Sequence, residues 1–413
     1  MNRSLPLFPA TSSLPSPRSS ELPESVSAPS GRAISALPSS GGLPLSQLLA
    51  ELQSLGLRWQ DPAGPGLARR GGAGPSDHKA ISLGNQTIMV PIFTHSSGRS
   101  PYTARVQAGG TRALLERDGV LVREITFPEE PRFYSLGTRD GIPYWKIARL
   151  HGRDVLATTV LQTCIRYGQR SSSCQFCAIG QSLAAKQTIA EKTPAQLAEV
   201  VHAAVTLDGI RHVVMTTGTP QTPDRGAAKL SACARAIRER TDVPIQAQCE
   251  PPDDFVWFER MREAGIDSLG MHLEAVSEEV RQRIMPGKAQ ISLAVYFQAF
   301  EQAVRVFGWG QVSTYILAGL GDSAQAILET SERLIGLGVY PFVVPFVPIA
   351  NTPLEHQPAP DASFMDQLLD GVAALLARAQ LRSSDIKAGC GRCGACSGLQ
   401  AREAAFSRQV SHA

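Results

Sequence analysis

Short apolar runs alternate with stretches of helical periodicity through residues 155–380, and this alternation constrains the fold more than any other feature. Runs such as VLATTVLQT (155–163), HVVMTTG (212–218) and VYPFVVPFVP (339–348) are apolar and rich in β-branched residues. Strands of this kind are buried on both faces, which is typical of a parallel sheet covered by helices. The alternation therefore predicts a parallel α/β fold.

The number of strands narrows the architecture. Three further strands are predicted at 244–250, 266–274 and 311–319, which makes six. Once the N-terminal part is subtracted, the chain is short for eight strand–helix units, and six units fit a partial (β/α)6 TIM barrel. In such folds the active site lies beyond the carboxyl ends of the strands. Helices are predicted at 193–209, 227–240, 253–265, 277–284, 291–307, 323–338 and 362–380, the first with Thr193 as its cap, Pro194 in its first turn and Gln196 completing a capping box.

Segments of different composition flank the barrel, which we place at residues 154–361. Residues 1–44 are rich in Ser, Pro and Gly and are predicted to be a disordered tail. Residues 45–153 start with a leucine-rich helix and continue as short strands up to PYWKIARLHG, so we expect a small β-rich N-terminal domain there. Residues 362–413 are expected to form a C-terminal helix and a Cys-rich extension that holds a metal.

Composition and charge exclude several classes of protein. Hydrophobic residues make up 43% of the 413 residues, which is ample for a core, and the net charge is only +3 with no long basic run. Nothing therefore indicates a nucleic acid or an acidic membrane as partner. No apolar stretch is long enough for a membrane span, and we see no secretory signal. We expect a cytoplasmic protein.

Six of the eight cysteines form two groups of three. Cys164, Cys174 and Cys177 directly follow the first predicted strand of the barrel. Groups of three in a large chain without a secretory signal are typical of metal or iron–sulfur ligation in a reducing compartment. Three thiolates can hold a 4Fe–4S cluster whose fourth iron is open to a substrate or cofactor, or a zinc ion that takes a distant His or Cys as its fourth ligand. Spacing alone favours neither.

The surrounding residues resemble the radical SAM superfamily. In CIRYGQRSSSCQFC (164–177) an aromatic residue precedes the last cysteine, and the strand–helix units follow in order. The usual motif is C-x3-C-x2-C, whereas the first gap here is nine residues, a variation that occurs in the superfamily. The resemblance covers residues 155–355. It implies a 4Fe–4S cluster on the three cysteines, reductive cleavage of S-adenosylmethionine (SAM), hydrogen abstraction from a small-metabolite substrate, and an electron donor such as flavodoxin or ferredoxin.

The same resemblance implies a set of SAM-binding residues. The turn TTGTP (216–220) stands where members hold the methionyl amine, and polar residues at strand ends bind the ribose and carboxylate of SAM. A helix cap or an ordinary turn is the alternative at each position taken singly. The implied residues are Thr217, Gly218 and Thr219 of the turn; Gln248, Glu250, His272 and Glu274 at two strand ends; Phe176 and Gly319 against adenine; and Arg281 or, preferably, Arg283 on the SAM carboxylate.

The second group of cysteines, Cys390, Cys393 and Cys396, has the spacing C-x2-C-x2-C. We favour a second, auxiliary iron–sulfur cluster, which could bind substrate, relay electrons or donate sulfur. The alternatives are a zinc site completed by a histidine or by Cys233 or Cys249, and thiols that bind no metal. Cys233 is expected in the core of a helix, whereas Cys249 ends a strand and could face the site.

A narrower resemblance concerns the radical SAM proteins of bacterial nitrilase-containing ("Nit-one") biosynthetic gene clusters. The long first gap, TTGTPQTPDRG, QCEPP and CGRCGAC carry it. It implies a small metabolite in a biosynthetic pathway, with a nitrilase-like enzyme, an acetyltransferase and a flavoprotein nearby. The rival hypothesis is a non-catalytic iron–sulfur or zinc scaffold or electron-transfer protein, which would need no SAM pocket.

Overall fold

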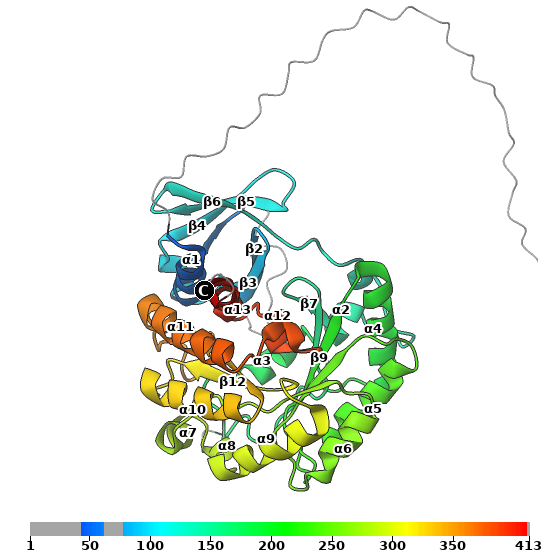
Figure 1. Ribbon diagram of the computed structural model, residues 1–413. Coiled ribbons are helices and arrows are strands. Elements are labelled where there is room, and N and C mark those ends of the chain that lie inside the picture. Colours follow the sequence, from blue (N-terminus) through cyan, green and yellow to red (C-terminus); the bar gives the residue numbers. More distant parts are fainter. Residues whose placement is uncertain (1–42, 62–76, 170, 411–413) are drawn as a thin grey trace, which may run out of the picture. The chain divides into compact units, whose positions relative to one another are not determined.

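The computed structural model describes residues 43–61, 77–169 and 171–410. Within these ranges the chain forms two β-sheets and the helices around them, all inside one compact unit, Leu43–Ala413 (Figure 1). The predicted disordered tail lies outside the described residues, apart from its last two. The leucine-rich helix that follows it is confirmed as α1 (Leu45–Leu55).

The larger sheet has the strand order β13-β12-β11-β10-β9-β8-β7. From β8 to β13 each strand pairs in parallel with its neighbour in sequence, as repeated strand–helix units require. The sheet confirms the predicted partial (β/α)6 barrel and all six of its strands. Their bounds are β8 (Val155–Thr159), β9 (His212–Thr216), β10 (Ile245–Gln248), β11 (Ser268–Gly270), β12 (Val312–Ala318) and β13 (Val339–Pro345).

One strand of this sheet differs from the prediction. β7 (Arg149–His151) pairs antiparallel with β8, so PYWKIARLHG contributes a strand to the barrel sheet and not to the N-terminal one. Gly152, at φ +59°, sits in the turn between β7 and β8. Pairing of this kind depends on contacts that the local sequence pattern does not report. The hairpin also brings His151 to the amino-terminal end of β8, opposite Val155.

The predicted helices are also confirmed, and they cover the outer face of the larger sheet (Figure 1). α4 begins with the expected capping box, in which Thr193 and Gln196 each accept a backbone hydrogen bond from the other. Packing of their apolar sides against the fully buried strands forms the main core of the molecule. The helices are α4 (Pro194–Asp208), α5 (Ala227–Arg238), α6 (Val256–Glu263), α7 (Glu278–Ile284), α8 (Pro286–Ala289), α9 (Leu293–Phe307), α10 (Ala324–Gly336) and α11 (Ala362–Arg378).

The smaller sheet belongs to the N-terminal part of the chain and has the order β1-β4-β5-β6-β2-β3. Its strands are antiparallel except for the β1–β4 pair, and together with α1 they enclose a separate apolar cluster. The short helix α2 (Tyr144–Ile147) leads from this part into β7. The strands are β1 (Arg58–Gln60), β2 (His78–Leu83), β3 (Gln86–Pro91), β4 (Tyr102–Val106), β5 (Arg112–Arg117) and β6 (Val120–Thr126).

The C-terminal segment runs between the two sheets. After α11 the chain forms α12 (Cys390–Cys393) and α13 (Leu399–Val410), and α12 lies between β3 and the larger sheet (Figure 1). Met89 of β3 donates its backbone N–H to the carbonyl of Ala395 at 2.7 Å, and Ser397 Oγ donates to the carbonyl of Val343 in β13 at 2.6 Å. The last cysteines are thereby held inside the molecule.

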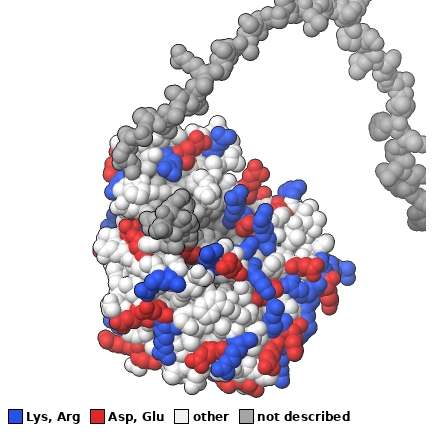
Figure 2. Space-filling model, viewed as in Figure 1, with Lys and Arg blue, Asp and Glu red and all other residues white. Residues whose placement is uncertain are grey.

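The surface carries charges of both signs. Lys and Arg side chains are interspersed with Asp and Glu on the face shown in Figure 2. None of the helices in the described ranges has the length and apolarity needed to cross a membrane.

Candidate active site

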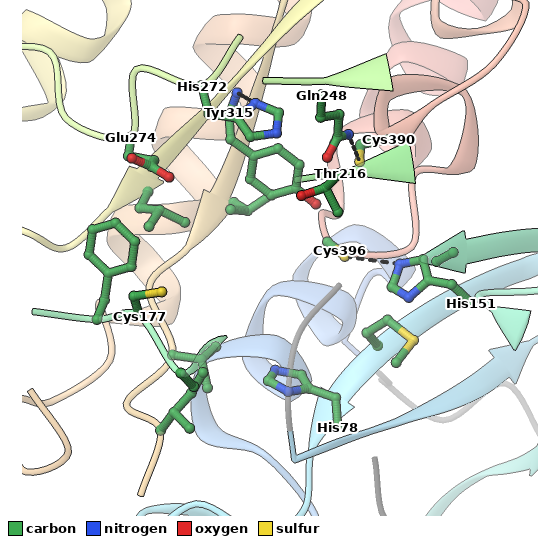
Figure 3. A pocket seen from close by; sticks show the side chains of 18 of the residues that line it. His78, His151, Cys177, Thr216, Gln248, His272, Glu274, Tyr315, Cys390 and Cys396 are labelled. Atoms are coloured by element: carbon green, nitrogen blue, oxygen red, sulfur yellow. Dashed lines mark hydrogen bonds between the residues drawn. The ribbon is translucent and has the colours of Figure 1, made fainter. Parts of the chain in front are cut away.

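A cavity of about 360 Å³ lies inside the curve of the larger sheet. Its wall is built from alternate residues of the strands, such as Ala157 and Thr159 of β8 and Val214 and Thr216 of β9, because successive side chains of a strand point to opposite faces. Both groups of cysteines reach this cavity. Figure 3 shows Cys177 on one side and Cys396 on the other, with the ring of Tyr315 between them.

The first group of cysteines begins at a close contact between two loops. A side chain on Gly218 would clash with the carbonyl oxygen of Thr163, the residue before Cys164. The two loops are also joined by hydrogen bonds: Gly218 N donates to Leu161 O at 2.8 Å, and Ile165 N donates to Thr219 O at 2.9 Å. The TTGTP turn therefore supports the start of the cysteine loop, and only glycine fits at its centre.

The described part of the long gap is a fixed turn. Arg166 Nη1 lies 2.6 and 2.5 Å from the two carboxylate oxygens of Glu250, and only about a tenth of either side chain is exposed. Ser172 and Ser173 donate their hydroxyls to the carbonyl of Arg166 at 3.1 and 2.8 Å. Gly287 N donates to Ser172 O at 3.2 Å. The extra residues thus anchor the loop to the barrel by a buried ion pair.

The three thiols lie close enough to influence one another. Burial raises the pKa of Cys177 to about 12, and the nearby Cys164 adds to the rise. Burial also raises the pKa of Cys174 well above its usual range, with Glu274 as the next cause. Within the described ranges no three His, Cys, Asp or Glu side chains are placed to hold a single metal ion. A 4Fe–4S cluster imposes a wider arrangement, because each thiolate binds a different iron.

His272 and Glu274 line the wall on the side of Cys177, and Lys288 pairs with Glu274 without lining the cavity itself. Lys288 Nζ lies 2.6 Å from Glu274 Oε2, with both side chains largely buried. Burial disfavours the charged form of Lys288, but Glu274 together with Tyr296, Glu250 and Cys174 outweighs it and raises the pKa above its usual value. Burial lowers the pKa of His272 to about 3, so this ring is neutral at neutral pH. Its Nδ1 accepts from Tyr315 N at 3.2 Å, which leaves the proton on Nε2.

The second group of cysteines meets the cavity from the opposite side. Cys390 Sγ accepts a hydrogen bond from Gln248 Nε2 at 3.1 Å, and Cys396 Sγ lies 3.4 Å from His151 Nε2 (Figure 3). The hydroxyl of Tyr315 lies near both Cys390 and Cys396. Side chains from β7, β10 and β12 therefore surround these sulfur atoms.

The predicted SAM-binding residues fall into two sets. Four of them line the cavity, namely Phe176, Gln248, His272 and Glu274. The others have protein neighbours: Glu250 pairs with Arg166, Arg283 donates to Leu320 O at 3.1 Å, Gly319 packs against Pro360, and Thr217, Gly218 and Thr219 belong to the turn that supports the cysteine loop. Arg281, weighed beside Arg283, is fully buried and donates to the carbonyls of Leu273 and Ile291.

Sequence reasoning missed several residues of the cavity and its surroundings. Lys288 ends the stretch RQRIMPGK (281–288), whose arginines were the predicted SAM-binding residues, and nothing in the local pattern distinguishes the lysine. His151, Thr216 and Tyr315 lie on strands, where their side chains face inward. Of the two single cysteines, Cys233 is buried on α5 as expected. Cys249, which could have faced the site, is buried in the apolar core instead.

Comparison with known proteins adds independent evidence. The model of the radical SAM superfamily matches residues 171–334. The bacteriochlorophyllide c C-7(1)-hydroxylase of Chlorobaculum limnaeum is 27% identical over 326 residues, which cover 70% of this chain and 81% of that protein. The lipoyl synthase of Marinobacter nauticus is 30% identical over 173 residues, which cover 40% of this chain and 47% of that protein.

Solved structures are more distant. A radical SAM methyltransferase from Sphaerobacter thermophilus aligns with a TM-score of 0.41 and 16% identity, over 67% of this chain and 75% of that one. The family model and the sequence relatives suffice, together with a parallel barrel whose cysteine loop follows its first parallel strand. The chain is an enzyme of the radical SAM superfamily.

Proposed function

We propose that Cys164, Cys174 and Cys177 hold the 4Fe–4S cluster that membership of the superfamily implies, and that the enzyme abstracts hydrogen from a small metabolite bound in the barrel cavity. One observation carries the proposal: Cys177 and Phe176 line a cavity enclosed by the parallel strands. When bound, such a cluster supplies the electron that splits SAM into methionine and a 5′-deoxyadenosyl radical, which takes a hydrogen atom from the substrate.

The chain's own residues would bind and orient SAM beside the thiols. We assign this role to Phe176, Gln248, His272 and Glu274, which line the cavity, and to the backbone of Thr217, Gly218, Thr219 and Gly319. Lys288 does not line the cavity and already pairs with Glu274, so we assign it to holding that carboxylate in place beside SAM. Glu250 and Arg283 already have protein partners, so we assign them to holding the loops around SAM rather than to SAM itself.

The cavity suits a small substrate and a reactive radical. Its volume of about 360 Å³ is that of a small-molecule site, and its wall is mostly apolar with a few polar groups. An apolar wall excludes water and offers few groups that compete with the substrate for the radical. Thr216 and Tyr315 provide hydroxyl groups that can orient a polar substrate.

The wider setting follows from the same proposal. We infer a reductant such as flavodoxin or ferredoxin as partner, and the reducing cytoplasm as the location. We also propose that the C-terminal cysteines hold a second iron–sulfur cluster. The resemblance to the proteins of nitrilase-containing gene clusters supports a role in the biosynthesis of a small metabolite. A scaffold or electron carrier is the weaker candidate, because it would need no cavity beside Cys177.

The test is SAM cleavage by the reconstituted enzyme. After anaerobic loading with iron and sulfide, addition of dithionite and SAM should yield 5′-deoxyadenosine, measured by chromatography. Cys177→Ala should lower the yield to the level without enzyme. Cys233→Ala, which alters a core thiol of α5 away from the cavity, is the matched control and should keep the activity. Equal yields from Cys177→Ala and the parent would rule the proposal out.

A further inference from the structure

The second group of cysteines converges on a histidine from a distant part of the chain. His151 Nε2 lies 3.4 Å from Cys396 Sγ, although 245 residues separate them in sequence. Cys393 Sγ packs closely against Gly152, the residue after His151. Glycine suits this contact because a Cβ at position 152 would lie only 3.1 Å from the sulfur. The hairpin between β7 and β8 thus places an imidazole against Cys396 and the next residue, Gly152, against Cys393.

The backbone of the cysteine segment is built to hold this arrangement. Gly389 N donates to His212 Nδ1 at 3.2 Å, and Cys390 N donates to Gln246 Oε1 at 3.2 Å. The two contacts tie the segment to the interior of the barrel. Side chains on the intervening glycines would clash with their neighbours, Gly389 with Gln246 and Gly394 with Gln400. Glycine at positions 389 and 394 therefore lets the cysteine segment pass close to these two glutamines.

Hydrogen-bond donors also point at the sulfur atoms. Gln248 donates to Cys390 Sγ, and the hydroxyl of Tyr315 contacts both Cys390 and Cys396. Donors on sulfur stabilise thiolates that bind iron and tune the potential of the site. Gln248 and Tyr315 line the cavity as well, so the same side chains contact the sulfur atoms and the space assigned to the substrate.

We propose that Cys390, Cys393, Cys396 and His151 are the four protein ligands of a second iron–sulfur cluster, which forms the wall of the cavity opposite Cys177. The inference deepens the proposed function and rests on it only for the position of the substrate between the two clusters. With four protein ligands this cluster has no open iron. It can exchange electrons with a molecule in the cavity, whereas the three-cysteine cluster can also bind SAM.

The experiment isolates the second site. A variant with Cys164, Cys174 and Cys177 all changed to Ala removes the first cluster, so any remaining iron belongs to the C-terminal site. After anaerobic loading, this variant should retain about four irons per chain. Reduced with dithionite and labelled with 15N-histidine, it should show a nitrogen coupling to the cluster in pulsed electron paramagnetic resonance.

Histidine variants in this background identify the ligand. His151→Ala should abolish the nitrogen coupling, and His151→Cys should retain the iron without the coupling, which separates loss of a ligand from loss of folding. His78→Ala is the matched control, because His78 lines the same cavity from β2, and it should change neither readout.

Three results would overturn the inference: binding of zinc or of no metal in the triple variant, persistence of the nitrogen coupling in His151→Ala, or its loss in His78→Ala. None of them depends on SAM cleavage. Failure of the proposed function would appear instead as absence of 5′-deoxyadenosine from a fully loaded parent enzyme.

Discussion

The two groups of cysteines are held in place by different kinds of interaction. The loop of Cys164, Cys174 and Cys177 is anchored by charged groups, above all the buried pair of Arg166 and Glu250. The C-terminal group is anchored by neutral contacts, from Gln246 and His212 to the backbone, and by glycines that allow close approach. Burial lowers the pKa of His212 to about 3, so this anchor too is neutral at neutral pH.

The difference is consistent with different tasks. On the proposed function, the first loop would leave one iron open for SAM and would need a rigid frame outside the cluster, which the buried ion pair of Arg166 and Glu250 supplies. The proposed second cluster, with four protein ligands, would be held partly by the ligands themselves. The comparison also predicts that each group can be damaged without the other, and the following experiments test that independence.

The largest expected effect concerns the cysteines themselves. Cys177→Ala should abolish formation of 5′-deoxyadenosine and lower the iron content from about eight to about four per chain. Cys393→Ala should lower iron by the same amount but leave SAM cleavage in place. Iron and 5′-deoxyadenosine are measured on the same samples. Loss of SAM cleavage in both variants would show that the two sites are not independent.

Two glycine substitutions should each remove one cluster and leave the other, because each added methyl group clashes with the neighbours of one site only. Gly218→Ala would push the new methyl group against the carbonyl of Thr163, so we expect loss of the first cluster. Gly389→Ala would push against Gln246, and at φ +115° an alanine is strained as well, so we expect loss of the second. Iron content and SAM cleavage of each variant give the measurement. If Gly389→Ala lost SAM cleavage while Gly218→Ala kept it, the comparison between the two sites would be contradicted.

The buried ion pair should matter for stability and for one cluster only. Arg166→Met leaves the carboxylate of Glu250 buried without a partner, which typically costs about 3–5 kcal/mol. Unfolding in urea measures the change, and iron release should be faster from the first site only. Replacing both partners, as Arg166→Met with Glu250→Leu, should recover much of the loss.

A surface pair provides the control for this variant. Arg378 and Glu332 are both about two-thirds exposed, so Arg378→Met should change the free energy of unfolding by less than about 1 kcal/mol. If Arg166→Met were equally mild, the charged anchor of the first loop would be unimportant.

A pH dependence is expected from Lys192, which donates to Thr159 O and Thr188 Oγ1. Burial lowers its pKa from 10.5 to about 7. Between these values the unfolded chain binds more protons than the folded one, so this lysine makes stability rise with pH from about 7 to 10.5. Lys192→Met should remove that contribution. Denaturation curves of the parent and of Lys192→Met at pH 7 and 9 give the change in the free energy of unfolding between these pH values. If that change were the same in both proteins, the lowered pKa of Lys192 would be contradicted.

Much of the fold could be predicted from the sequence because its signals are local. The apolar runs predict β8 to β13, and the capping box of Thr193 and Gln196 predicts the start of α4; the structure confirms both. The position of β7 could not be predicted, because its pairing with β8 competes with pairing elsewhere in a β-rich region.

The candidate site divides in the same way. The sequence by itself determined the six clustered cysteines, the barrel that carries the first group, and three cavity-lining residues: Gln248 at the end of β10, and His272 and Glu274, which were expected at a strand end but lie just beyond β11. Only the tertiary structure decided that Arg166 holds Glu250, that Lys288 pairs with Glu274, and that His151 lies against Cys396 across 245 residues. The physical reason is that spacing and periodicity describe neighbours along the chain, whereas ion pairs and ligand sets form between side chains that folding brings together.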